Sequence, residues 1–143
     1  MGLAASYLVA DPAQRDSTNY VPESSRRARA VPVYAALRSL GRSGVAELVE
    51  RNCAHARRMA ARLAQIPGAR VLNDVVLNQV LVAFEGGDEA NHAAVAAVQR
   101  DGTCWLGGTE WEGRAVMRLS FSNWATTDAD VDRSADAIAA PVS

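Results

Sequence analysis

A stripe of mainly apolar side chains runs along residues 45–63 at a period near 3.6 residues. This spacing predicts an amphipathic helix whose stripe packs into a protein core, while arginines occupy the opposite face. Pro67-Gly68 is expected to end this helix, because both residues are common just beyond a helix C-terminus. The stripe consists of Val45, Leu48, Val49, Asn52, Ala56, Met59, Ala60 and Leu63.

A shorter helical pattern precedes it, over residues 26–40. Pro32 interrupts this pattern, so the helix either kinks there or begins there. Gly41 is expected to close it. Residues 1–22, by contrast, are dense in turn-forming residues and are predicted to be irregular.

The C-terminal half shows strand patterns. Residues 78–84 are rich in valine and leucine, and residues 115–121 alternate between two faces. Shorter strands are predicted at residues 70–73 and 103–106. The expected turns are Asp101-Gly102, a hairpin at Gly107-Gly108, and Glu112-Gly113.

Two helices are predicted among these strands. Asp88 is expected to cap the first, which runs to Arg100. Thr127 is expected to cap the last, whose first turn is acidic and therefore suits the positive end of the helix dipole. Its predicted buried stripe is Val131, Ala135 and Ile138.

The order of elements predicts an α+β fold. Helices are expected to cover one face of a short, partly antiparallel sheet. A chain of 143 residues, with 49% hydrophobic residues, is long enough for one ordinary domain with a buried core.

Composition narrows the possible functions. All 15 cationic side chains are arginine, there is no lysine, and the net charge is −1. Such a balance gives no general attraction to nucleic acid or to a membrane surface. The arginine cluster at Arg57, Arg58 and Arg62 is interpreted as the solvated face of a helix.

The cysteines and histidines give no indication of a metal site or of an oxidising compartment. Cys53 and Cys104 form no CxxC motif and are expected to be reduced thiols, and His55 and His92 are isolated. No metal site is therefore expected. No apolar run is long enough to span a bilayer, and the N-terminus lacks the features of a secretory signal, so the expected location is the cytoplasm.

Two residues are candidates for chemistry. Arg118 lies within an alternating strand pattern, where it either faces solvent or is held rigidly enough for its planar fork to bind a carboxylate. Tyr7 lies in the irregular N-terminal segment, where it is either an anchoring aromatic residue or a proton donor that closes over a substrate. Trp105 and Trp111 are expected to pack across a hairpin rather than stack on a ligand.

Three stretches, in the same order and at fitting separations, resemble group II decarboxylases that depend on pyridoxal phosphate (PLP). This is the family of aromatic-L-amino-acid and glutamate decarboxylases, with the fold of the aspartate aminotransferase superfamily. The stretches are an arginine-rich helix start at residues 25–41, the opening of a long helix at 44–51, and a final strand and helix at 116–132.

The resemblance implies a division of the chain. Residues 1–22 would be a remnant of the mobile catalytic loop, residues 23–66 connecting helices, and residues 67–143 the C-terminal small domain. Tyr7 would then protonate the substrate after carbon dioxide leaves, and Arg118 would pair with a substrate carboxylate. The large domain of the family, which holds PLP, has no counterpart in these residues.

The absence of lysine decides what the resemblance can mean. In the family PLP forms a Schiff base with a lysine amine, and the always-protonated guanidinium of arginine cannot replace that nucleophile. We therefore expect this chain to bind no PLP and to be inactive alone, as a truncated gene product, a shortened polypeptide, or the partner of a separate PLP-binding chain. A stand-alone α+β interaction or regulatory module is the alternative.

A missing domain would also leave apolar surface bare. We expect the chain to self-associate as a homodimer or a higher oligomer, because a monomer rarely exposes large apolar patches.

Overall fold

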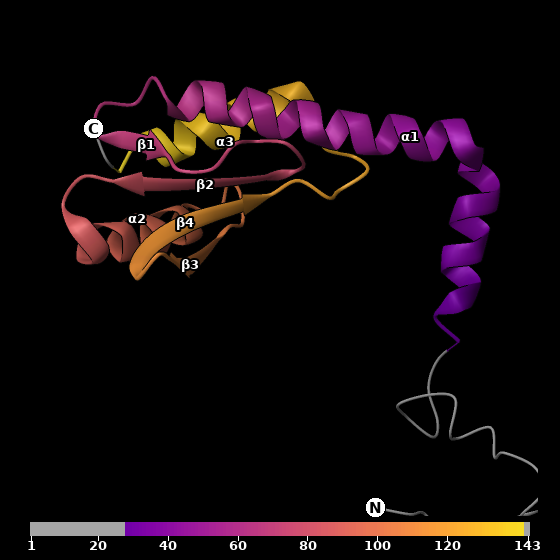
Figure 1. Ribbon diagram of the computed structural model, residues 1–143, viewed down its shortest axis with the longest axis horizontal. Coiled ribbons are helices and arrows are strands. Elements are labelled where there is room, and N and C mark those ends of the chain that lie inside the picture. Colours follow the sequence, from indigo (N-terminus) through magenta and orange to yellow (C-terminus); the bar gives the residue numbers. More distant parts are fainter. Residues whose placement is uncertain (1–27, 142–143) are drawn as a thin grey trace, which may run out of the picture. The chain divides into compact units, whose positions relative to one another are not determined.

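A computed structural model describes residues 28–141 of the chain. The chain divides into two compact units, residues 1–40 and residues 41–143. Helix α1 (Ala30–Leu63) runs through the division, and Gly41 interrupts it with a φ of 63° and a ψ of −175° (Figure 1). Glycine adopts this left-handed φ without steric cost. The predicted helix end at Gly41 is therefore confirmed, although both parts are helical.

The second part of α1 supplies one wall of the core. Ala56, Met59 and Leu63 are fully buried, and Asn52 is nearly so, which confirms most of the predicted stripe. Val49 is an exception, because 51% of its surface is exposed. The helix ends at Leu63, before Pro67-Gly68, where Gly68 takes a positive φ of 76°.

The sheet has four strands in the order β1-β2-β4-β3. All three strand pairs are antiparallel, so the prediction of a partly antiparallel sheet is corrected to a fully antiparallel one for the described residues. The chain leaves β2 through α2 and β3 and comes back beside β2 as β4, antiparallel to it. The strands are β1 (Ala69–Val71), β2 (Gln79–Phe84), β3 (Gly107–Trp111) and β4 (Arg114–Ser120).

The turn of the β3–β4 hairpin lies at Glu112-Gly113, where a turn was predicted, and not at Gly107-Gly108. Glu112 and Gly113 have φ values of 51° and 73°. Gly107 and Gly108 instead begin β3, and residues 103–106 are not a strand. Trp105 therefore precedes the hairpin, and its predicted packing across it is wrong. Two positive φ values in succession suit a tight hairpin turn, and this placement sets the register that pairs Trp111 with Arg114. The predicted hairpin at Gly107-Gly108 is therefore wrong.

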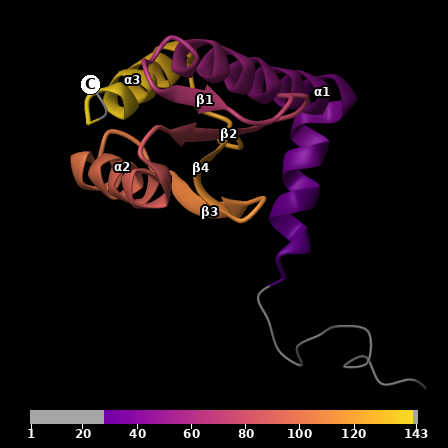
Figure 2. The same cartoon turned by 60° about the vertical axis from the view of Figure 1, so that its left-hand side comes forward.

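Helices α1, α2 (Gly87–Asp101) and α3 (Asp128–Ala139) share one core with the sheet. Figures 1 and 2 show α3 alongside the second part of α1, and α2 against the strands. The sheet residues of this core alternate along β2 and β4, which places them on a single face. Leu81 and Val116, which belong to the opposite set, are also buried but lie outside this core cluster. As predicted, helices cover one face of the sheet. The sheet residues in this core are Val80, Val82, Phe84, Met117 and Leu119.

The helix starts show one confirmed cap and one wrong prediction. Thr127 caps α3 in a capping box: its hydroxyl accepts from the Asp130 amide, and Asp130 Oδ2 accepts from the Thr127 amide at 2.8 Å. Asp88 does not cap α2, whose cap is Gly86 without a side-chain hydrogen bond. Asp88 Oδ1 instead accepts from the Ala115 amide of β4 at 2.9 Å.

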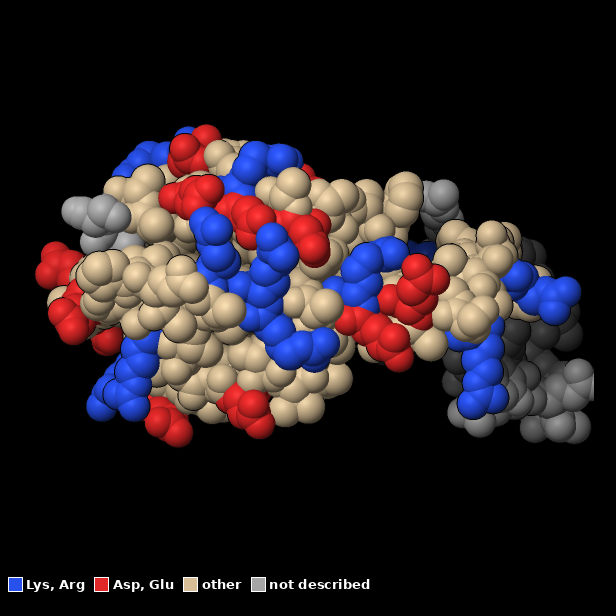
Figure 3. Space-filling view, turned by 90° about the horizontal axis from the view of Figure 1, so that it is seen from above, with Lys and Arg blue, Asp and Glu red and all other residues tan. Residues whose placement is uncertain are grey.

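Arginines of α1 face the aspartates of α3. Arg58 donates from Nε and Nη2 to the two carboxylate oxygens of Asp132, at 2.9 and 2.7 Å, and Arg62 pairs with Asp136. Figure 3, which views the molecule from the side of α1 and α3, shows cationic and anionic side chains next to one another on this surface. Arg58 and Arg62 remain solvent-exposed, as expected for the solvated face of a helix, and the structure adds ion pairs to α3.

Candidate functional site

Arg118 lies in β4, next to the middle of the sheet. Its register partners are Leu81 on β2 and Gly107 on β3. Because Met117 and Leu119 point into the core, Arg118 points to the opposite face, where its side chain is exposed. The structure supports the interpretation that Arg118 faces solvent. It also places Arg118 on a hydrogen-bonded strand, which the second interpretation, binding of a carboxylate, requires.

Arg118 has no hydrogen bond and no ion pair among residues 28–141. The same holds for Arg70 on β1 and Arg114 on β4, whose register places them on this face too. No strand position on this face carries a carboxylate. We call it the open face, and its three guanidiniums are free to bind an anion, in contrast to the paired arginines of α1.

Polar side chains continue the open face beyond Arg118. Gln79 Nε2 donates to Ser120 Oγ at 3.3 Å across β2 and β4. Asn78 Nδ2 donates to the Phe121 carbonyl at 2.7 Å. These bonds fix the end of β4 that lies nearest to Arg118, so the guanidinium is carried on a well-held segment.

Tyr7 lies outside the described residues, so its predicted role stays a prediction. Among residues 28–141 no three His, Cys, Asp or Glu side chains gather in a way that could hold a metal ion. In the same part of the chain no helix is both long and apolar enough to span a membrane.

His55, which has no evident partner in the sequence, has one in the structure. His55 is buried in α1, and its Nε2 lies 3.3 Å from Asp128 Oδ1 at the start of α3. Its ring tilts against Phe121, with 6.2 Å between ring centroids. Arg58 also reaches Asp128, with 3.4 Å between Nη1 and Oδ2. Because a substrate could not reach the buried imidazole, we assign this group to the packing of α1 on α3.

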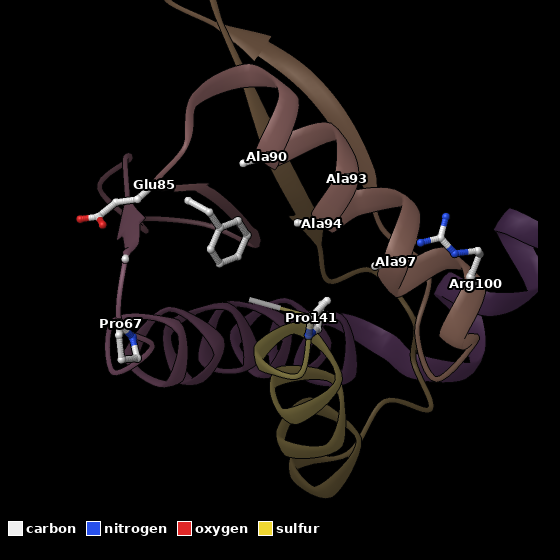
Figure 4. A pocket seen from close by; sticks show the side chains of 10 residues that line it. Pro67, Glu85, Ala90, Ala93, Ala94, Ala97, Arg100 and Pro141 are labelled. Atoms are coloured by element: carbon white, nitrogen blue, oxygen red, sulfur yellow. The ribbon is translucent and has the colours of Figure 1, made fainter. Parts of the chain in front are cut away.

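A cavity of about 560 Å³ lies beside α2, on the helical side of the sheet. Figure 4 shows four alanines of α2 lining it, with the Glu85 carboxylate directed away from them. Only Glu85 and Arg100 among its lining residues can ionise, so it offers little for catalysis. The other lining residues are Pro67, Gly68, Phe84, Ala90, Ala93, Ala94, Ala97 and Pro141.

We compared the sequence and the structure with known proteins. No protein-family model matches the sequence, and no curated protein matches it significantly. Solved structures do match. Catharanthus roseus tryptophan decarboxylase in complex with L-tryptophan superposes with a TM-score of 0.76 at 17% identity, over 87% of this chain and 28% of the enzyme.

Oryza sativa TDC with PLP and tryptamine gives a TM-score of 0.75 at 18% identity, over 86% of this chain and 28% of that one. The chain shares its fold with PLP-dependent decarboxylases. A third match is the glutamate decarboxylase domain of a Vibrio parahaemolyticus diaminobutyrate-pyruvate transaminase and L-2,4-diaminobutyrate decarboxylase, with a TM-score of 0.65 at 20% identity, over 78% of this chain and 25% of that one. The resemblance inferred from the sequence is thus confirmed for the fold, and the chain spans about 28% of the first enzymes it matches.

The residues present do not fit covalently bound PLP. The cofactor is held by a lysine amine, and none of the 143 residues is a lysine. The guanidiniums of the open face can bind a carboxylate or a phosphate, but they remain protonated and form no Schiff base.

Proposed function

We propose that this chain is the C-terminal portion of a PLP-dependent amino-acid decarboxylase, a carboxy-lyase that acts on an aromatic or acidic amino acid. The observation that carries the proposal is the TM-score of 0.76 with tryptophan decarboxylase over 87% of the chain. In this proposal residues 1–22 belong to the catalytic loop, residues 23–66 form the connecting helices, and residues 67–143 form the small domain. A separate large domain supplies the lysine and holds PLP.

Arg118 is the residue we propose to bind the substrate carboxylate. Its guanidinium is exposed, unpaired among the described residues, and mounted on a hydrogen-bonded strand. A rigid planar fork binds a carboxylate through two parallel hydrogen bonds, which fixes the orientation of the substrate as well as its position. Arg118 would thus orient the substrate, while the cofactor supplies the electron-accepting chemistry from another polypeptide segment.

Tyr7 is the residue we propose as the proton donor. Its phenol would deliver a proton to the substrate carbon that has lost carbon dioxide. This role rests on the resemblance of residues 1–8 to the segment that follows the lysine in the family.

The chain is proposed to be inactive alone and to self-associate. Large apolar side chains are exposed in both units, which supports a covered state in the working protein. In the helix of residues 30–40 they include Val33, at 58%, and Leu37, at 52%. On the second unit Val76 and Leu77 are exposed at 67% and 64%. A homodimer or a larger assembly would bury such side chains.

The DNA upstream of Met1 offers the test. We expect an in-frame extension that encodes a His-Lys pair, and the product expressed with that extension should release carbon dioxide from an amino acid. Arg118→Gln in that product should lower kcat/KM by roughly a hundredfold, because it removes a charge-assisted pair to the substrate. The matched control is Arg114→Gln, an exposed and unpaired arginine of the same strand and face, which should change kcat/KM less than about twofold. Equal losses in the two variants would contradict the role of Arg118.

A further inference from the structure

The helix of residues 30–40 carries a row of large apolar side chains on one face. Val33, Leu37 and Leu40 recur at spacings of four and three residues, and Tyr34 lies beside them. These four residues are between 43% and 65% exposed, and no residue from 28 to 40 is buried. A helix this short is marginal in water unless its apolar face is packed, so this face requires a partner.

The second unit has an apolar groove of about 560 Å³, the cavity beside α2. Ala90, Ala93, Ala94 and Ala97 line it from one face of α2, as Figure 4 shows, and we call it the alanine groove. The buried Phe84 of β2 also lines it. A helix face made of alanines leaves room for the larger side chains of another helix, which fit between the small ones.

The apolar row and the groove match in length and spacing. Val33 to Leu40 and Ala90 to Ala97 each span two helical turns, about 10 Å along the helix axis. Anchors at this spacing are the usual means by which an amphipathic helix lies in a hydrophobic groove. The row therefore supplies large side chains where the groove has small ones.

Their charges are complementary as well. Residues 28–40 contain two arginines and no acidic residue, and Arg38 follows Leu37 at the border of the apolar row. Glu85 lines the groove and Glu89 lies in the first turn of α2, and neither forms an ion pair among residues 28–141. Figure 4 shows Glu85 and Arg100 on opposite sides of the groove. A helix that lies antiparallel to α2 places Arg38 near the two glutamates and away from Arg100, and it also opposes the two helix dipoles.

We propose that the alanine groove of one copy of the chain binds the helix of residues 30–40 of a second copy. The large apolar side chains lie among the alanines, and Arg38 pairs with the carboxylates of Glu85 and Glu89. Each copy has one helix and one groove, so two copies that bind each other's helix form two such contacts and close as a dimer. The inference specifies the interface of the proposed self-association and does not depend on the decarboxylase assignment.

Two charged substitutions, each in its own chain, test the contact. Leu37→Glu disrupts the helix and keeps the groove, whereas Ala93→Glu disrupts the groove and keeps the helix. Each variant alone should associate at least about a hundredfold more weakly than the parent chain, because the new carboxylate would be buried among apolar side chains without a partner. Light scattering after size exclusion should then give the monomer mass of 15.2 kDa for each.

Mixing the two variants in equal amounts should restore association. The helix of the Ala93 variant and the groove of the Leu37 variant are both intact, so one of the two contacts can form. Native mass spectrometry should show a heterodimer, which also demonstrates that both variants are folded.

Matched controls carry the same new charge at neighbouring positions. Val31→Glu changes an exposed residue on the opposite side of the helix from Val33, and His92→Glu changes an exposed residue of α2 that does not line the groove. Both control variants should keep the mass of the parent chain.

The outcomes separate this inference from the proposals above. If the parent chain associates but the mixed variants stay monomeric, or if His92→Glu disrupts association as much as Ala93→Glu, the inference fails and self-association stands. Dissociation by Leu37→Glu but not by Ala93→Glu would mean that the helices pair with each other, which overturns the groove contact. A monomeric parent chain, including one whose helix lies in its own groove, refutes both the inference and self-association. The decarboxylase assignment is unaffected by any of these results, because carbon dioxide release tests it separately.

Discussion

Replacing Met117 by alanine should remove a large share of the stability of the second unit. Met117 is fully buried, and β4 lies between β2 and β3. Its register partners are the fully buried Val82 and the side-chain-free Gly108. Hydrogen bonds to both neighbouring strands prevent the backbone from closing the cavity, so we expect a loss of about 3–4 kcal/mol, in the upper half of the usual range for Met→Ala. A domain of this size has only about 5–15 kcal/mol of stability.

Urea unfolding followed by circular dichroism measures this loss. Leu77→Ala is the control, because Leu77 is 64% exposed and should change the free energy of unfolding by less than about 0.5 kcal/mol. The comparison asks whether residues 41–143 have a native core of their own without a large domain. If the Met117 variant lost less than about 1 kcal/mol, the core we describe would be wrong or would need another polypeptide to form.

Three further predictions follow from particular contacts. Asn91→Ala should cost roughly 3 kcal/mol in urea unfolding, because buried Asn91 bonds both backbone groups of Phe84, which the variant leaves unpaired; a loss below about 1 kcal/mol would contradict this. Thr127→Ala should cost about 1 kcal/mol near neutral pH. The hydroxyl and amide of Thr127 lower the pKa of Asp130, so this difference should persist above the unfolded pKa of about 4 and shrink as the pH falls through the lowered folded value; a constant or growing difference would refute the linkage. In light scattering after size exclusion the chain should exceed its monomer mass of 15.2 kDa, and Leu37→Glu should shift it towards monomer, whereas a monomeric parent chain would contradict self-association.

Local chemistry made several elements predictable. Gly41 interrupts α1 because a left-handed backbone conformation favours glycine, and this preference can be read from one residue. Thr127 followed by Asp130 is a local capping pattern, and the structure contains the full capping box. The stripe of Ala56, Met59 and Leu63 was also predictable, because helical periodicity depends only on near neighbours.

Long-range pairing made other elements unpredictable. Two glycine-containing dipeptides compete for the hairpin, and only the register of β3 with β4 selects the turn at Glu112-Gly113 over Gly107-Gly108. Asp88 has the right residue type for a cap, yet its carboxylate is used by Ala115, which is 27 residues away. Asn91 was missed as well, although a lone amide in an apolar helix face is a usable sign of a buried hydrogen-bonding role.

The candidate site also has one feature that the sequence predicts and one that it does not. The alternation of residues 115–121 correctly placed Arg118 opposite Met117 and Leu119, because strand periodicity is local. That Arg118 lacks a partner among the described residues, while Arg58 and Arg62 have partners on α3, depends on contacts between distant segments. No local pattern distinguishes these arginines.

Carbon dioxide release by the chain, with and without a lysine-bearing polypeptide, tests the central claim most directly. The partner would be the PLP-binding segment encoded upstream, expressed separately and mixed with the 143 residues. We predict no release from any amino acid by the chain and PLP alone, and release once the partner is added. Turnover by the chain alone would contradict the account, because it would mean that the chemistry proceeds without the lysine amine.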